Sequence, residues 1–133
     1  MIRHLFLFLF LATAAGAAEP TVPTVAPHDL AAKVAAGSAP LVLDVRSQQE
    51  FDAGHVPGAV LIPHDQLEKR LAELGPPREV VVYCRSGHRA GLVEPLLVAK
   101  GFEVSELAGD WQAWQAAGLP EEKPAAAAGA SSP

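Results

Sequence analysis

Hydrophobic and polar residues alternate along the chain in short blocks that predict strands and helices in turn. Compact apolar runs predict strands at 41–43, 60–62 and 80–83, and we interpret 103–107 as another strand. Between them, longer stretches with apolar residues at helical spacing predict helices at 28–36, 65–74, 89–100 and 110–117. The run Val80-Val81-Val82-Tyr83 is the most strongly β-forming, so we expect it to be a central strand.

Local signals mark where several of these elements begin and end. The segment from Ser47 to Glu50 has the spacing of a capping box, which predicts one more short helix. Gly101 follows the predicted helix at 89–100, a place where glycine commonly ends a helix. Pro95 lies inside the same helix, and we expect it to bend the helix because it removes a backbone hydrogen bond.

The alternation of strands and helices predicts the fold class. It indicates a single α/β domain with a mostly parallel central sheet and helices on both faces. A length of 133 residues with 50% hydrophobic residues suits one domain with one core. In such sheets ligands bind at the carboxyl ends of strands. Cys84 follows one predicted strand, and Asp44 and Arg46 follow another, so we expect all three at the same edge.

The two ends of the chain differ from the middle in composition. Residues 1–18 carry Arg3, an apolar run and then small residues, which is typical of a secretory signal peptide. Their apolar stretch of 14 residues is shorter than a membrane span. We interpret 19–27 as an extended leader, 28–119 as the folded domain and 120–133 as a disordered tail. The protein is therefore expected to be periplasmic or secreted, without stable membrane insertion.

Charge and composition exclude several classes of partner. The formal net charge is −5 and aromatic residues are 6% of the chain, which argues against a nucleic-acid-binding surface. His28 and His64 are too scattered to indicate a metal site. We expect no cofactor, small-molecule partners and a monomer.

The only cysteine, Cys84, begins the segment C-R-S-G-H-R, which ends at Arg89. A thiol between a strand and a helix faces the positive end of that helix, and two arginines lie in the same loop. Such surroundings favour the nucleophilic thiolate, and loop amides can form a small nest for its charge. A lone cysteine in an exported protein cannot form an internal disulfide. The alternative is an inert cysteine buried at the end of a strand.

Several motifs that follow one another along the chain resemble those of a single-domain rhodanese. They are Leu43-Asp44-Val45-Arg46, Glu50-Phe51, Gly54-His55-Val56-Pro57-Gly58-Ala59, Ile62-Pro63, Tyr83-Cys84-Arg85-Ser86-Gly87-His88-Arg89, Gly101-Phe102, and Leu107-Ala108-Gly109 followed by Trp114. The similarity runs from about His28 to Leu119, nearly the whole predicted domain. The resemblance implies a rhodanese-like fold over this region.

The resemblance also implies a thiosulfate sulfurtransferase. Cys84 would take the outer sulfur of thiosulfate, release sulfite and hold a persulfide, then pass sulfur to a thiophile such as cyanide or a thiol. Arg85 and Arg89 would attract the dianionic donor and stabilise negative charge. Backbone N–H groups for the persulfide would come from Ser86, Gly87 and His88.

Other matching residues are expected to be structural. Asp44 and Arg46 should form a buried network of charges and hydrogen bonds under the loop. His55 should order its turn rather than act as an acid or base. Trp111 and Trp114 lie three residues apart, which more often indicates core packing than ligand stacking.

Two positions depart from the rhodanese pattern. Glu94-Pro95 replaces the small helix-forming residues usual there, so a bend in the helix would weaken its contribution at Cys84. Asp110 stands where a second glycine is often found.

Other functions fit parts of the same pattern. Cysteine phosphatases and arsenate reductases on this fold place five residues between cysteine and arginine, whereas four separate Cys84 from Arg89. The shorter loop makes a tighter cradle that suits a sulfur atom better than a tetrahedral oxyanion. A non-catalytic sulfur-binding or redox-sensing module is a further alternative, although the cysteine and both arginines are present. Protein disulfide exchange would need a second cysteine.

Overall fold

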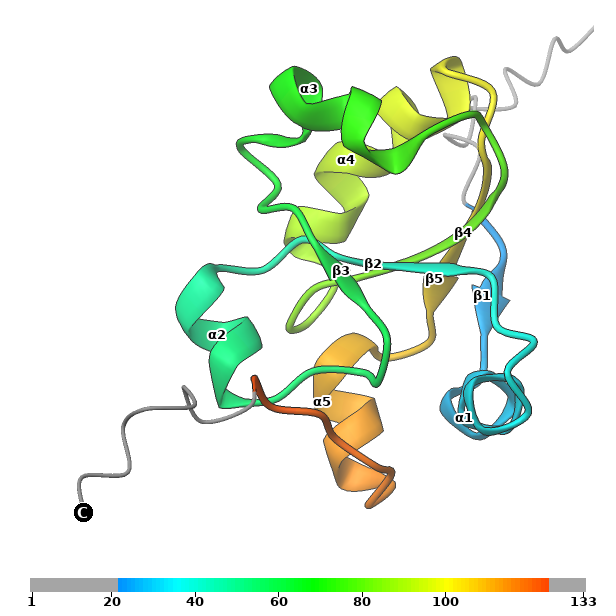
Figure 1. The fold of residues 1–133 in the computed structure, drawn as a ribbon, viewed down its shortest axis with the longest axis vertical. Helices are drawn as coiled ribbons and strands as arrows, with labels where there is room; N and C mark the ends of the chain where they lie inside the picture. The colour runs from blue at the N-terminus through cyan, green and yellow to red at the C-terminus, as the bar shows by residue number, and fades with distance from the viewer. Residues whose placement is uncertain (1–21, 125–133) are drawn as a thin grey trace, which may run out of the picture.

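The computed structural model describes residues 22–124 and shows a parallel five-stranded sheet between two layers of helices (Figure 1). The predicted signal peptide at 1–18 lies outside the described residues. No helix in the described part of the chain is long and apolar enough to cross a membrane.

The sheet confirms the predicted fold class. Its strands are β1 (Thr24–Val25), β2 (Leu41–Asp44), β3 (Val60–Leu61), β4 (Glu79–Tyr83) and β5 (Glu103–Leu107). Their spatial order is β1-β5-β4-β2-β3, and every neighbouring pair is parallel. The most strongly β-forming run therefore occupies the centre, where both faces of a strand are buried.

The helices lie close to their predicted positions. They are α1 (Pro27–Ala35), α2 (Gln48–Ala53), α3 (Leu67–Arg70), α4 (His88–Ala99) and α5 (Asp110–Ala116), with a 3-10 helix η1 (Leu71–Leu74). The capping box of α2 is confirmed, since Ser47 Oγ accepts the Glu50 N–H over 3.2 Å and Glu50 Oε1 accepts the Ser47 N–H over 3.3 Å. The helix predicted at 65–74 is instead split between α3 and η1.

Alternate residues of the central strand feed two separate cores. Val80 and Val82 pack on one face with residues of α3 and α4, whereas Val81 and Tyr83 pack on the other with residues of α1 and α5. This is the period of two expected of a strand. Cys84 continues the first set and faces α4.

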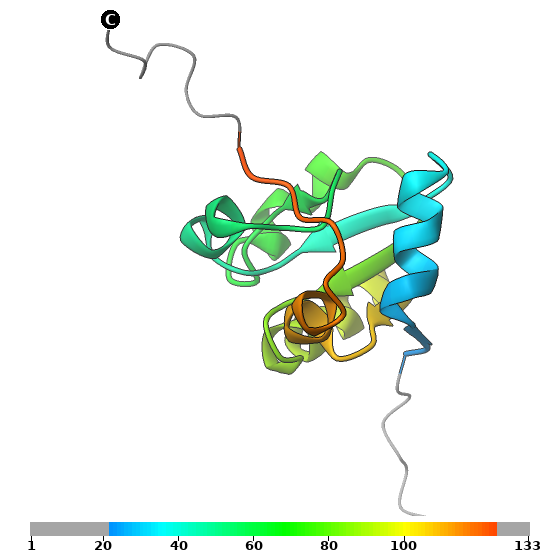
Figure 2. The same ribbon diagram turned by 90° about the horizontal axis from the view of Figure 1, so that it is seen from below.

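Both predicted ends of the domain need correction. Thr24 and Val25 do not form a free leader but pair with β5 as an edge strand. The segment after α5 runs back towards α2 (Figure 2), where Glu122 exchanges two backbone hydrogen bonds with His55, of 2.9 and 2.8 Å. The buried Trp114 indole N–H also donates to the carbonyl of Pro120 over 2.9 Å. The buried Trp114 indole and the His55 backbone find their hydrogen-bond partners in Pro120 and Glu122. The ordered domain therefore extends beyond the predicted start of the tail at 120.

Pro95 does not interrupt α4. The helix is assigned without a break from His88 to Ala99. Pro95 has no N–H to donate to the carbonyl of Gly91, one turn earlier. Both residues lie on the exposed side of the helix, where water can bond that carbonyl instead. The turn next to Cys84 keeps its hydrogen bond from Gly91 N–H to Gly87 C=O at 2.9 Å.

Truncating Leu43 should destabilise the domain much more than truncating Leu92. Leu43 is fully buried at the centre of the sheet, whereas Leu92 is 58% exposed on α4. Leu43→Ala should lower the free energy of unfolding by about 2–5 kcal/mol through lost burial and a residual cavity, and Leu92→Ala should change it by less than about 1 kcal/mol. Urea denaturation of both variants checks this, and equal losses would contradict the assigned core.

Candidate active site

Cys84 lies where β4 ends and the loop to α4 begins. Gly87, the residue before α4, has a φ of 110°, a conformation that residues with a Cβ rarely adopt. Its backbone N–H donates a hydrogen bond to Cys84 Sγ over 3.0 Å. The sulfur therefore lies at the amino end of a helix of 12 residues, where negative charge is stabilised.

One of the three loop amides predicted to face the sulfur does so. In the described part of the chain, no hydrogen bond joins Ser86 or His88 to the sulfur, whereas Gly87 makes one. Cys84 is 1% exposed, and the side chains of Arg85, Ser86 and His88 lie on the surface. The loop thus shields the thiol with its backbone and keeps its polar side chains outside.

The predicted network of Asp44 and Arg46 is confirmed. Arg46 Nη2 lies 2.7 Å from Asp44 Oδ2 and donates to the Gly54 carbonyl over 2.7 Å, with both charged residues buried. The guanidinium also lies over the ring of Trp111, 4.6 Å from its centroid. Burial opposes the charge of Arg46, but the hydrogen bonds and charge of Asp44 outweigh it and raise the pKa of the guanidinium.

Arg89 is held by a partner that the sequence did not indicate. Its guanidinium donates to both carboxylate oxygens of Glu50, over 2.7 and 2.9 Å, and joins α4 to α2. These bonds lower the pKa of Glu50 to about 2 against the opposing effect of burial. By contrast, no ion pair in the described part of the chain includes Arg85. Arg85 is therefore the loop cation that is left to meet a ligand.

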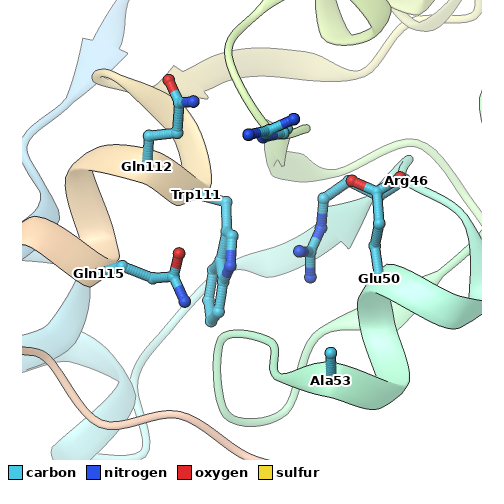
Figure 3. Close-up of a pocket in the computed structure, with 7 residues that line it drawn as sticks. Arg46, Glu50, Ala53, Trp111, Gln112 and Gln115 are labelled. Atoms are coloured by element: carbon cyan, nitrogen blue, oxygen red, sulfur yellow. The ribbon is translucent and has the colours of Figure 1, made fainter.

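A cleft of about 600 Å³ opens beside the loop (Figure 3). Figure 3 shows Trp111 projecting from α5 between Gln115 and the guanidinium of Arg46. The residues that line the cleft are Arg46, Glu50, Ala53, Arg85, Trp111, Gln112 and Gln115. The cleft thus combines cationic, amide and aromatic groups at the carboxyl edge of the sheet, where ligands of such folds bind.

The start of α5 anchors the loop. Asp110 Oδ1 accepts the Cys84 N–H over 2.9 Å, and the Trp111 N–H donates to the Cys84 carbonyl over 3.0 Å. The Gln112 N–H donates to the Arg85 carbonyl over 3.2 Å. Asp110 has a φ of 55°, the one positive value outside glycine in the described residues. A left-handed backbone favours glycine, and aspartate tolerates that conformation.

Sequence reasoning missed the part that α5 plays in the site. Trp111 was expected to be a core residue, and it is 6% exposed, but its ring also forms a wall of the cleft. Gln112 and Gln115 were not singled out at all. Their position in the sequence could have indicated a role in the site, because α5 begins just beyond the carboxyl end of β5, where ligands of such sheets bind.

The remaining candidates have the structural roles expected of them. His55 stacks on Phe51 with ring centroids 3.5 Å apart, and its Nδ1 lies 2.8 Å from the Phe51 carbonyl. Trp114 is fully buried. Within the described ranges, no group of three or more His, Cys, Asp or Glu side chains is arranged to hold a metal ion.

Comparisons with known proteins show which family the chain resembles. Residues 26–117 match the family described as "Rhodanese-like domain". The chain is 41% identical over 90 residues to an HTH-type transcriptional regulator of Mycobacterium tuberculosis, a match that covers 66% of this chain and 39% of the regulator. It is 36% identical over 81 residues to a sulfurtransferase of Allochromatium vinosum, covering 60% of this chain and 76% of that protein.

A solved structure extends the similarity to the fold. The thiosulfate sulfurtransferase of Pseudomonas aeruginosa superposes with a TM-score of 0.67 at 32% identity, over 80% of this chain and 20% of that one. The chain spans less than half the length of the first curated relatives that it matches. The similarity is thus to one domain of several larger proteins.

The pair between Glu50 and Arg89 should stabilise the fold at neutral pH and cease to do so in acid. Because the pKa of Glu50 is lowered from 4.5 to about 2, its contribution is present above about pH 4.5 and is lost as the pH falls towards 2. The Glu50 side chain is 31% exposed, so we expect Glu50→Gln to cost only about 1 kcal/mol at pH 7. Glutamine keeps an oxygen for the capping box, so the variant removes the charge and one of the two hydrogen bonds to Arg89 without removing the cap.

Urea unfolding of both proteins between about pH 7 and pH 3.5 measures this difference. Glu73→Gln is the control, because Glu73 and Arg70 form a pair that is exposed on both sides. If the difference in the free energy of unfolding between the wild type and Glu50→Gln stays constant with pH, the ion pair between Glu50 and Arg89 is contradicted.

Proposed function

The chain belongs to the family of rhodanese-like domains, and on this premise we propose that it is a sulfurtransferase that carries sulfane sulfur as a persulfide on Cys84. The observation that carries the proposal is the hydrogen bond from Gly87 N–H to Cys84 Sγ at the amino end of α4. It stabilises negative charge on a sulfur atom, which both a thiolate and a persulfide need. The relatives named as sulfurtransferases support the same reaction class.

In the first half-reaction the Cys84 thiolate attacks the outer sulfur of thiosulfate. A bond forms between the two sulfur atoms, the S–S bond of thiosulfate breaks, and its electron pair leaves with sulfite. The negative charge of the thiolate passes to the terminal sulfur of the persulfide. The Gly87 amide stabilises that charge, and Arg85 attracts the dianionic donor from the cleft side. We assign Arg89 a supporting role, since it also holds Glu50.

In the second half-reaction a thiophilic acceptor removes the outer sulfur. Cyanide leaves as thiocyanate, and a thiolate leaves as a persulfide; either step returns Cys84 to its thiolate. The cleft of about 600 Å³ is much larger than cyanide. Its amide and cationic lining favours a larger polar acceptor over cyanide.

A non-catalytic sulfur-binding or sensing module is the second candidate. The relative that is a transcriptional regulator favours it, because the similar region there is part of a regulatory protein. The two candidates share the persulfide but differ in turnover. Catalytic release of sulfite in the presence of an acceptor supports the enzyme, whereas a single stoichiometric loading supports the sensor.

We extend the proposal to location and assembly. The amino-terminal segment with Arg3 and its apolar run directs export, so the domain works in the periplasm or outside the cell. It works as a monomer without a cofactor. Fractionation of cells that produce the full chain tests the location, and retention in the cytoplasm would contradict it.

Incubation with thiosulfate should add one sulfur atom, about 32 Da, to the protein. The chain has one cysteine, so the adduct must map to Cys84. Intact mass spectrometry with a parallel sulfite assay measures both products. Cys84→Ser should lose the adduct and the sulfite release together. A wild-type protein that hydrolyses an aryl phosphate but takes up no sulfur would favour the phosphatase alternative instead.

Arg85→Ala should weaken the use of thiosulfate. Removing the free cation beside the cleft should raise the KM for thiosulfate by about tenfold, and Arg85→Lys should restore part of the loss. Arg78→Ala is the matched control, because Arg78 is exposed and lies before β4, at the opposite end of that strand. Steady-state kinetics with cyanide as acceptor provide the measurement, and similar effects at both positions would refute the role of Arg85.

A further inference from the structure

Three carboxyl groups lie behind the Cys84 loop, on the side of the sheet that faces α4. Glu106 comes from β5, Glu94 from α4 and Asp110 from the start of α5. Asp110 is 3% exposed, and one oxygen each of Glu94 and Glu106 is buried without a hydrogen-bond partner. No ion pair among the described residues includes any of the three. Ionising all three carboxyl groups at once is costly, because burial without a neighbouring cation disfavours their charged forms.

Two of these carboxyl groups contact the loop at Gly87. A Cβ on Gly87 would lie 3.2 Å from Asp110 Oδ2 and 3.5 Å from Glu106 Oε1. The same glycine donates its N–H to Cys84 Sγ, and the other oxygen of Asp110 accepts the Cys84 N–H. Any change of charge on the pair therefore acts directly beneath the sulfur.

Asp110 Oδ2 and Glu106 Oε1 lie 3.2 and 3.5 Å from one point, the place that a Cβ on Gly87 would take, so the two carboxyl groups border the same small space. Two ionised carboxylates have no proton to share, so a bond between them requires one of them to be protonated. Burial, together with the charges of Asp110 and Glu94, raises the pKa of Glu106 to about 7. Burial also raises the pKa of Asp110, but the hydrogen bonds from Cys84 and Glu106 oppose that rise. Because Asp110 Oδ1 accepts the Cys84 N–H over 2.9 Å, we place the negative charge on Asp110 and the proton on Glu106.

We propose that Glu106 and Asp110 share one proton beneath the Cys84 loop, and that loss of this proton weakens the binding of anionic sulfur donors there. The identity of the donor rests on the proposed function. With the proton in place the pair carries one negative charge, and without it two. The groups that face the pair are Cys84 from the end of β4 and Glu94 from α4, and neither supplies a compensating cation. Glu106 is thus a positioning residue that acts through the loop.

The shared proton can be tested without any assay of activity. The carboxyl carbons of the glutamates are followed by NMR from about pH 4 to about pH 9. In the wild type we expect Glu106 to titrate near 7, and Glu106→Gln should remove that signal. Asp110→Asn tolerates the left-handed backbone and should shift the titration of Glu106 to lower pH, because the neighbouring charge is gone. A wild-type Glu106 that titrates near its ordinary 4.5 would overturn the inference.

The effect on donors is tested by the pH dependence of sulfur uptake from thiosulfate. Glu106→Gln keeps a hydrogen-bond donor towards Asp110 at every pH, so it mimics the protonated pair. As the pH rises from about 6 to about 8, the rate of sulfur uptake by the wild type should fall about fivefold relative to that of this variant. The fall should come from a higher KM for thiosulfate rather than from a lower saturated rate. The control Glu103→Gln, at an exposed position on the same strand, should follow the wild type. Identical profiles for the wild type and Glu106→Gln would overturn the effect.

The two proposals fail in different ways. Sulfur uptake together with an ordinary titration of Glu106 contradicts the shared proton and leaves the sulfurtransferase standing. No uptake at any pH, with Glu106 titrating near 7, contradicts the sulfurtransferase and the effect on donors but leaves the shared proton.

Discussion

The site depends on the anchoring of Cys84 through three of its atoms. Its N–H is bound by Asp110, its carbonyl by the N–H of Trp111, and its sulfur by the N–H of Gly87. These partners come from the loop itself and from the start of α5. They can converge because β4 and β5 are parallel neighbours whose carboxyl ends lie at one edge of the sheet. The topology thus fixes Cys84, the proposed nucleophile, in place through backbone contacts and one carboxylate.

Among the residues that the structure describes, carboxylates pair with two of the three arginines at the site and leave Arg85 without an ion pair. Asp44 neutralises Arg46, and Glu50 neutralises Arg89, so both guanidinium groups bind helices and loops together. Arg85 remains on the wall of the cleft. In the proposed reaction, selection of an anionic donor would then depend on the Gly87 amide and one exposed charge rather than on a broad basic surface. That fits a chain with a formal net charge of −5, in which long-range attraction of anions is weak.

Local patterns predicted most of the fold, and contacts between distant residues account for what they missed. The capping box at Ser47 and the β-branched run of β4 depend on neighbouring residues, and the structure confirms both. Arg89 lies 39 positions from Glu50, and no short motif marks that pair. The two-residue strand β1 is too short for a pattern and exists because β5 offers a free edge. For the same reason Cys84 could be proposed as the nucleophile from sequence, whereas its contacts with α5 could not.

Asp110 connects the geometry of the loop to its charge. A glycine would satisfy the left-handed backbone at this position but would leave the Cys84 N–H without the acceptor that it has here. Aspartate supplies the acceptor and brings a negative charge under the site that we propose to hold an anionic sulfur. The half-buried Glu106 would double that charge if it were ionised, and its raised pKa makes the neutral form accessible near neutral pH. The departure from glycine at Asp110 is therefore compatible with sulfur chemistry because a second carboxyl group beside it can hold a proton.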